Sequence, residues 1–339
     1  MSADRTVQAV DPVDAVAMGV ETDLPTDVPL LCRGLGKRYG SMQALDGLDL
    51  RIGPGDVVGY LGPNGSGKTT TLRLLTGALR PSEGSASLFG HDCWSDRRRA
   101  HERLGYVPSE PDYDPRLTGA ELLSLSGRLR GRDRAADREA RKRTVQRLGI
   151  DTGRRVGELS RGNRQKLALA LALWHRPDVL LLDEPSTGLD PLAQDVMHDL
   201  VTGAADDGAA VLFSSHVLSE VQQLARRVVL LHHGRVIDRA DMAELWRRTP
   251  HRLKAIVATA AQAVDLAEAL GHTPGVGAVE VEDRTVRCRF SSTVMNDVVH
   301  TLAARPVLDL SVEDTSLDEW FDDALDGFTR ARAHGGGGR

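Results

Sequence analysis

The stretch GPNGSGKT, residues 62–69, matches the phosphate-loop pattern G-x-x-x-x-G-K-S/T in full. The apolar segment Asp56–Leu61 comes directly before it and predicts a strand. From Lys68 onward, leucines at 72, 75 and 79 share one side of a predicted helix. A strand, a glycine-rich turn and a helix in this order bring backbone N–H groups and a positive helix end to a bound polyphosphate. The stretch therefore predicts a nucleotide-binding α/β domain.

The residue types in this stretch each have a use in binding ATP. Lys68 is expected to reach the β- and γ-phosphates, and the hydroxyl of Thr69 is expected to ligate Mg²⁺. The glycines allow the backbone to wrap closely around the phosphates. The predicted nucleotide-binding residues of the loop and the first helical turn are Gly62, Pro63, Asn64, Gly65, Ser66, Gly67, Lys68, Thr69 and Thr70.

A second apolar segment, Val179–Leu182, ends in two carboxylates, Asp183 and Glu184. The carboxyl end of a buried strand places Asp183 where it can hold Mg²⁺ together with Thr69. Glu184 is expected to orient or deprotonate the attacking water, as the catalytic carboxylate. Alone, this pattern indicates only a strand end, but a phosphate loop 115 residues upstream makes it the second half of an ATP site.

Composition and charge narrow the class of protein. The 339 residues are 41% hydrophobic and 27% charged, which is typical of a soluble globular chain. The longest apolar run, Leu167–Trp174, is eight residues, far short of the ~20 that cross a bilayer. Residues 1–30 hold six acidic side chains against one arginine and so account for the whole net charge of −5. The rest of the chain is neutral in sum, and no nucleic-acid partner is predicted.

The pattern of strands and helices divides the chain. Residues 1–28 predict an acidic flexible tail, and residues 326–339 predict a flexible glycine-rich tail. Residues 29–248 alternate between strand and helix signals, which predicts one α/β domain with a helical subdomain inserted at about 112–165. Residues 252–325 read strand, helix, strand, strand, helix, strand, helix, the order of a small ferredoxin-like α+β domain with one added helix. Since this second domain lacks a phosphate loop, we expect it to lie outside the ATP site.

The segment LSRGN, residues 159–163, narrows the family. It resembles the signature motif of the ATP-binding subunits of ABC transporters, with Arg161 in place of the usual glycine, a variant similar to that of the drug-efflux branch. The resemblance covers about residues 30–248 and implies a P-loop NTPase core of the ABC ATPase type. It further implies an adenine-stacking Tyr39, signature residues Ser160 and Gly162 that complete the ATP site of a second subunit in trans, a D-loop Asp190, and a catalytic switch histidine, His216.

Two more segments bear on the resemblance. The family normally carries Gln at the loop that joins the core to the helical subdomain, whereas this chain has Ser109, whose shorter hydroxyl becomes a candidate metal ligand. The segment Thr315–Phe321 resembles the C-terminal extension of efflux-type ABC ATPases.

The resemblance implies a Mg²⁺-dependent ATPase that powers a membrane permease on a separate chain, for export of a drug-like or lipid-like compound. The implied partners are a second ATPase subunit, as a homodimer, and the permease, which would hold the protein at the cytoplasmic face of the cell membrane. Pro111–Leu117 and Glu121–Leu125 are the predicted contacts for the permease. The alternative is a soluble ABC-type ATPase acting on the ribosome or DNA. A single copy of each motif and the absence of a long coiled coil between Lys68 and Asp183 argue against it.

Overall fold

The computed structural model describes residues 27–248, 251–314, 320, 321 and 324 of the 339. The two predicted tails, at 1–28 and 326–339, lie outside this part except for Asp27 and Val28. Of the predicted last helix, at 317–325, only Trp320, Phe321 and Ala324 are described, and they are helical. By internal contacts the chain forms two compact units, residues 1–217 with 229–236, and residues 218–228 with 237–339.

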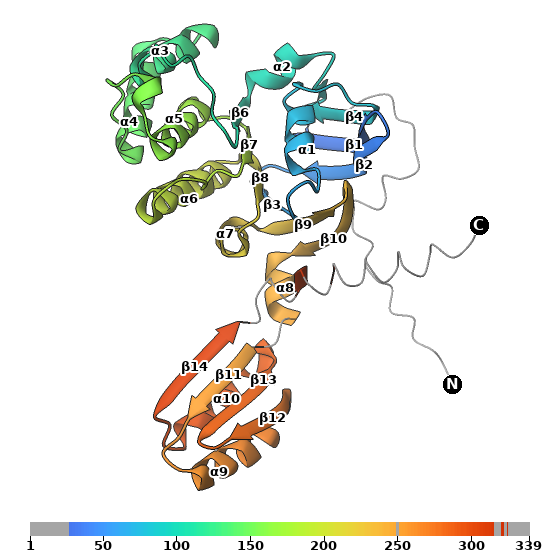
Figure 1. Ribbon diagram of the computed structural model, residues 1–339, viewed down its shortest axis with the longest axis vertical. Coiled ribbons are helices and arrows are strands. Elements are labelled where there is room, and N and C mark those ends of the chain that lie inside the picture. Colours follow the sequence, from blue (N-terminus) through green and yellow to red (C-terminus); the bar gives the residue numbers. More distant parts are fainter. Residues whose placement is uncertain (1–26, 249–250, 315–319, 322–323, 325–339) are drawn as a thin grey trace, which may run out of the picture. The chain divides into compact units, whose positions relative to one another are not determined.

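The first unit begins with an antiparallel sheet of four strands in the order β2-β1-β4-β5 (Figure 1). Its inward side chains, such as Leu30, Leu48 and Leu88, are fully or almost fully buried and form one core with the parallel sheet described next. The strands are β1 (Leu30–Tyr39), β2 (Met42–Ile52), β4 (Glu83–Leu88) and β5 (His91–Asp92), and α2 (Arg97–Glu102) follows them.

A six-stranded sheet in the order β10-β9-β3-β8-β7-β6 carries the phosphate loop. β3 pairs in parallel with β8, β8 with β7, and β7 with β6. Because the carboxyl ends of parallel neighbours meet at one edge, the residues that follow β3, β7 and β8 come together there. The elements are β3 (Val57–Leu61), α1 (Lys68–Leu75), β6 (Leu104–Val107), β7 (Val179–Asp183), β8 (Ala210–Ser215), β9 (Arg227–His232) and β10 (Arg235–Asp241).

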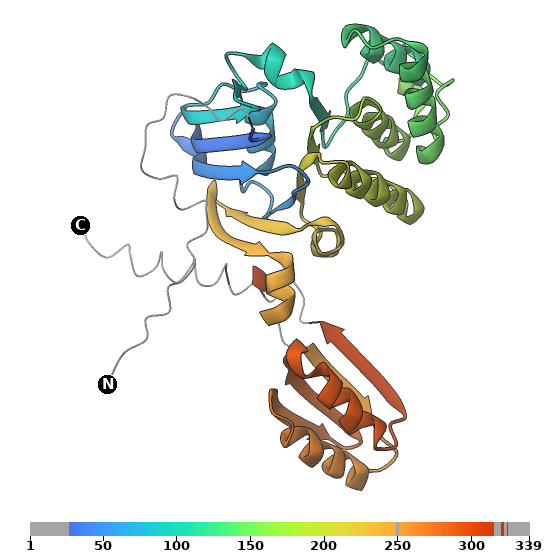
Figure 2. The same ribbon diagram turned by 180° about the vertical axis from the view of Figure 1, so that it is seen from behind.

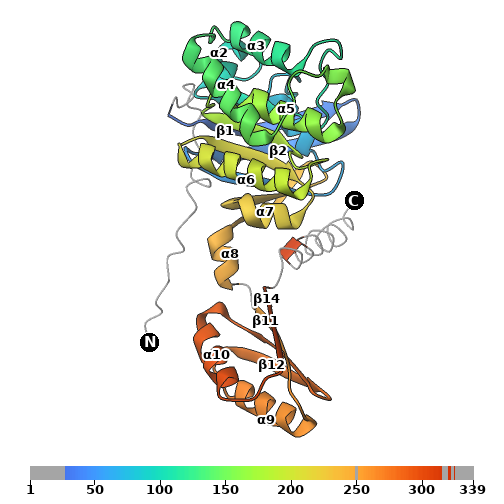
Figure 3. The ribbon, with the colours of Figure 1, turned by 90° about the vertical axis from the view of Figure 1, so that its left-hand side faces the viewer.

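Four helices of the first unit lie in the predicted helical subdomain or follow it in sequence. Figures 1 and 2 show α3, α4 and α5 grouped at one end of the unit and the antiparallel sheet at the other. In Figure 3, α5 and α6 run side by side. A capping box of Thr118 and Glu121 starts α3, and Gly149 in a left-handed conformation ends α4. The helices are α3 (Gly119–Leu129), α4 (Ala135–Leu148), α5 (Arg161–Leu173) and α6 (Pro191–Asp206), with a short 3-10 turn η2 (Val156–Glu158).

The second unit contains a four-stranded antiparallel sheet in the order β12-β13-β11-β14. Leu253 and Phe290 on its two central strands pack with Leu266 and Val298 of two helices in a separate hydrophobic core. The order strand, helix, strand, strand, helix, strand predicted from residue 252 onward is present. Its elements are β11 (His251–Ile256), α9 (Ala260–Gly271), β12 (Val276–Glu282), β13 (Thr285–Phe290), η3 (Ser292–Val294), α10 (Met295–Ala303) and β14 (Asp309–Asp314); α7 (Leu218–Leu224) and α8 (Met242–Arg248) also belong to this unit.

Among the helices that the structure describes, none is both long enough and apolar enough to span a bilayer.

Candidate functional site

The phosphate-loop residues connect β3 to α1, as predicted from the sequence. Two of its glycines are required by close packing. A Cβ atom on Gly62 would lie 2.3 Å from the carbonyl oxygen of Leu231, and one on Gly67 would lie 2.7 Å from that of Ala44. Gly67 also has a φ of 112°, a left-handed conformation that favours glycine. The loop is therefore held tightly against neighbouring backbone, with the N-terminus of α1 at its end.

Lys68 lies under this loop and is only 6% exposed. Its Nζ donates hydrogen bonds to the carbonyl oxygens of Gly62, at 2.5 Å, and Pro63, at 3.2 Å. Burial lowers the pKa of Lys68, while the nearby charges of Glu184 and Asp183 act in the opposite direction. The amine of Lys68 is therefore held within the phosphate loop.

Asp183 ends β7 and is buried among hydroxyl groups. Its Oδ1 accepts hydrogen bonds from Ser214 Oγ at 2.6 Å and from Thr69 Oγ1 at 3.3 Å. Its Oδ2 is buried and has no hydrogen-bond partner. A buried carboxylate oxygen without a partner is costly unless a cation or a donor reaches it.

These oxygens fit Mg²⁺, which prefers one or two carboxylates together with water and phosphate oxygens. Asp183 Oδ2 and the Thr69 hydroxyl are the atoms that would hold it. In the part of the chain that the structure describes, no group of three or more His, Cys, Asp or Glu side chains is arranged to hold a metal ion.

Glu184 follows Asp183 in a strained backbone conformation, with a φ of 49°. Its N–H donates to both the carbonyl oxygen and the Oγ of Ser214, each at 3.1 Å. Its carboxylate lies 3.2 Å from Nδ1 of His216 and accepts a bond of 3.5 Å from Thr187 Oγ1. Backbone strain of this kind is common at functional sites. It holds a side chain in a direction that a regular strand would not give it.

Ser214, at the end of β8, is a site residue whose role could not be predicted from the sequence. It bonds both Asp183 and the backbone of Glu184, and so holds the two carboxylates at the sheet edge. Its position directly before Ser215 and His216, at the end of an apolar strand, is the signal that could have identified it.

The predicted signature residues lie at the start of α5. Ser160 caps this helix, since its Oγ accepts a hydrogen bond from the N–H of Asn163 at 3.2 Å. A Cβ atom on Gly162 would lie 2.4 Å from the carbonyl oxygen of Gly188, so the helix packs closely on the loop before Asp190. Asp190 caps α6 in the same way, because its Oδ1 accepts a hydrogen bond from the N–H of Ala193. This hydrogen bond is the main cause of the lowered pKa of the Asp190 carboxyl.

The structure brings together some predicted site residues and leaves others apart. Hydrogen bonds link Lys68 to the loop and Thr69 to Asp183, and the carboxylate of Glu184 lies beside the ring of His216. Tyr39 is 42% exposed at the end of β1, with the Lys37 ammonium 5.1 Å from its ring centre. Within the described residues, neither Tyr39 nor Ser109 makes a hydrogen bond with the loop, Asp183 or Glu184.

Comparisons with known proteins agree with this geometry. Residues 45–187 match the model of the ABC transporter family. The daunorubicin resistance ATP-binding protein DrrA3 of Streptomyces coeruleorubidus is 36% identical over 294 residues, which are 86% of this chain and 92% of that protein. The chain therefore belongs to the ATP-binding proteins of ABC transporters.

Further relatives support the same assignment. The daunorubicin/doxorubicin resistance ATP-binding protein DrrA of Streptomyces peucetius is 40% identical to this ABC ATPase. The match covers 62% of the present chain and 65% of DrrA. A dimeric structure of an ATP-binding cassette in a post-hydrolysis state, bound to ADP and Pi, has the same fold, with a TM-score of 0.58, 23% identity, and coverage of 63% of this chain and 98% of that one.

Proposed function

We propose that this chain is the ATP-hydrolysing motor of an ABC exporter for drug-like or lipid-like compounds. It would drive a permease encoded on a separate chain and work at the cytoplasmic face of the cell membrane. The observation that carries the proposal is the meeting of Lys68, Thr69, Asp183, Glu184 and His216 at one edge of a parallel sheet. The names of DrrA and DrrA3, which refer to resistance to daunorubicin, support export as the direction.

The residues divide the work of hydrolysis among them. The loop N–H groups and the Lys68 ammonium bind the phosphates and offset the charge that develops on them. Glu184 accepts the proton of the attacking water, and His216, 3.2 Å from its carboxylate, holds Glu184 in place and reaches toward the γ-phosphate. Mg²⁺, held by Thr69 and Asp183, would neutralise charge on the phosphate oxygens.

A second copy of the chain completes each ATP site. Ser160 and Gly162 lie at the N-terminus of α5, where free N–H groups and the helix dipole favour an anion. Facing the loop of another copy, this helix end would enclose the triphosphate from the opposite side, with Asp190 in the connecting loop and Tyr39 stacked on the adenine. The dimeric form of the related cassette supports this arrangement.

The permease is proposed to bind beside the helical subdomain. A hollow of about 1060 Å³ lies there, and Tyr113, Leu122 and Leu125 of the predicted contact segments line it. Leu129, 79% exposed, adds apolar surface at its edge. A short amphipathic segment of a membrane protein would cover these side chains.

The domain limits belong to the same proposal. By function, we assign residues 29–248 to the ATPase domain, α7 and α8 included although they belong to the second unit by contacts, with the helical subdomain at about 112–165. Residues 252–325 are proposed to form a ferredoxin-like domain that regulates or stabilises the dimer. The strand order β12-β13-β11-β14, in which all neighbours are antiparallel, supports a ferredoxin-like plan.

Mixing two inactive variants tests the completion of each site in trans. A Lys68→Ala chain keeps its signature helix, and a Ser160→Arg chain keeps its phosphate loop, so a mixed dimer has one intact site. We expect hydrolysis to return on mixing, and a mixture of Lys68→Ala with a chain carrying both substitutions serves as the inactive control. Full activity of a strictly monomeric wild-type chain would contradict the proposal.

A further inference from the structure

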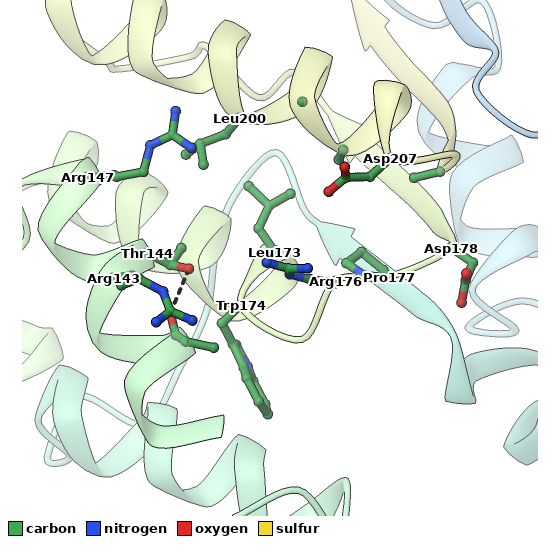
Figure 4. A pocket seen from close by; sticks show the side chains of 14 residues that line it. Arg143, Thr144, Arg147, Leu173, Trp174, Arg176, Pro177, Asp178, Leu200 and Asp207 are labelled. Atoms are coloured by element: carbon green, nitrogen blue, oxygen red, sulfur yellow. Dashed lines mark hydrogen bonds between the residues drawn. The ribbon is translucent and has the colours of Figure 1, made fainter. Parts of the chain in front are cut away.

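A second hollow, of about 700 Å³, lies on the first unit away from the phosphate loop (Figure 4). Its walls come from α4, from the turn that joins α5 to β7, and from the C-terminal half of α6. Leu173 and Leu200 give it an apolar floor, and Gly203 and Ala204 leave room beside α6. The hollow is therefore open to a ligand that is partly apolar.

Three arginines line this hollow with side chains that make no ion pair to the described residues. Arg143 and Arg147 come from the last two turns of α4, and Arg176 comes from the turn after α5 (Figure 4). None of the three makes an ion pair within the residues that the structure describes. On the same helix, by contrast, Arg141 is buried and bonds Asp133 at 2.6 Å. The hollow thus gathers guanidinium groups that have not been neutralised by neighbouring carboxylates.

The backbone of Arg176 has a strained conformation in the turn after α5. Its φ is 51°, in the left-handed region that Gly or Asn usually occupies at a helix end. Arg176 stands in this turn directly before Pro177, and its guanidinium faces the same hollow as the two arginines of α4 (Figure 4).

Two carboxylates also line the hollow, Asp178 from the turn that carries Arg176 and Asp207 from the end of α6. Asp178 is engaged by Arg103, whose Nε lies 2.6 Å from its Oδ2. Asp207 follows the end of α6 and makes no ion pair within the described residues. The charge of the hollow is therefore net positive, and Asp207 is the side chain that opposes an incoming anion.

We propose that this hollow binds a phosphate monoester that carries an apolar group. Three guanidinium groups match a phosphate dianion, because each offers paired N–H donors to its oxygens. The apolar group of the ligand would lie against Leu173 and Leu200. The phosphate of a lipid headgroup and a free phosphate share this chemistry.

The site is separate from the ATP site but connected to it by rigid elements. The hollow lies at the C-terminal ends of α5 and α6, whose N-terminal ends carry Ser160 and Asp190. The 13 and 16 residues of these helices span roughly 20 and 24 Å at ~1.5 Å per residue. A ligand that joins α4 to these ends would restrain the two helices that reach the nucleotide.

Titration calorimetry on the full chain tests the proposal, with Mg·ADP present in excess so that the phosphate loop is occupied. The probes are dihexanoyl phosphatidic acid and inorganic phosphate. We expect the lipid phosphate to bind the wild type, Arg143→Glu to weaken it roughly tenfold or more, and Asp207→Asn to tighten it. Binding of inorganic phosphate with equal affinity would support the same site for free phosphate.

Lys142→Glu is the matched control, since Lys142 is exposed on the same helix but does not line the hollow. It makes the same charge change and should leave binding unchanged. The affinity of each variant for ATP, measured separately, shows that the chain is folded and keeps a failure of this site distinct from a failure of the ATPase proposal. The proposal is overturned if neither probe binds the wild type, or if Lys142→Glu weakens binding as much as Arg143→Glu.

Discussion

The parallel sheet of the first unit and the antiparallel sheet of the second bury their residues in different ways. Every residue of β3, β7 and β8 is buried, since both faces of these strands are covered. In β13 of the second unit, buried and less buried residues alternate, with Val286, Cys288 and Phe290 inward and Arg287 and Arg289 outward. A sheet covered on both faces has polar chemistry only where its strands end.

The polar atoms of the two sheets differ accordingly. At the carboxyl edge of the parallel sheet, Asp183 Oδ2 and Ser66 Oγ are buried without a hydrogen-bond partner. Among the described residues of 251–314, no buried side-chain polar atom is left without one, and ions such as Arg287 and Glu282 pair at 2.6 Å on the surface. The carboxyl edge of the first sheet therefore has buried polar atoms left for a ligand, whereas the buried polar atoms of the second sheet are already paired within the fold.

The largest effect is expected from Lys68→Ala. This change removes the buried cation of the phosphate loop, and ATP binding measured by calorimetry should be lost. Lys254→Ala is the matched control, because it removes an exposed lysine from the other sheet and should leave ATP affinity unchanged. ATP affinity that survives Lys68→Ala would remove the basis for separating the two sheets by function.

A core substitution in the second unit should lower stability and leave ATP affinity unchanged. Phe290 is 1% exposed, and Phe290→Ala should lower the free energy of unfolding of this unit by about 3–5 kcal/mol. ATP affinity of the full chain should stay at the wild-type value. Chemical denaturation followed alongside calorimetry checks both expectations, and a loss of ATP affinity in a chain that remains folded would show that the second sheet contributes to the site.

A smaller effect is expected from His175, which follows α5 in the first unit. Burial lowers its pKa to about 4, with the Arg130 charge as a further cause, and its Nε2 donates to the carbonyl oxygen of Leu104 at 3.3 Å. The unfolded chain takes up this proton near the ordinary value of 6.5, so protonation favours unfolding as pH falls from 6.5 to 4. The free energy of unfolding should fall by up to about 3 kcal/mol in this window.

His175→Phe should flatten that part of the stability curve, because Phe takes up no proton. Denaturant unfolding of both proteins at a series of pH values makes the comparison. Equal slopes for the two proteins between pH 6.5 and 4 would show that other groups cause the acid sensitivity of the first unit.

Much of the fold could be predicted because its signals are local. The phosphate loop and the strand before Asp183 depend on residues close together in sequence, and both lie where they were expected. The sequence alone predicts strands only at Leu31–Leu35 and Leu48–Ile52, whereas β1 and β2 are longer. Register shifts near Leu35 and Lys37 interrupt the alternation that reveals a strand.

The contacts of the site were harder to predict because they are tertiary. The bonds of Ser214 to Asp183 and Glu184 join two strands, and the packing of Gly162 on Gly188 joins a helix to a loop. The hollow with Arg143, Arg147 and Arg176 combines residues from α4, the turn after α5 and the end of α6, of which the sequence suggests only a charged helix face.

The substitution Glu184→Gln tests whether the edge of the parallel sheet binds ATP and hydrolyses it with a carboxylate. Glutamine keeps the size of the side chain and cannot take the proton from water. ATP binding by calorimetry should persist, while phosphate release slows by roughly 10²- to 10⁴-fold. Hydrolysis at the wild-type rate would contradict the account.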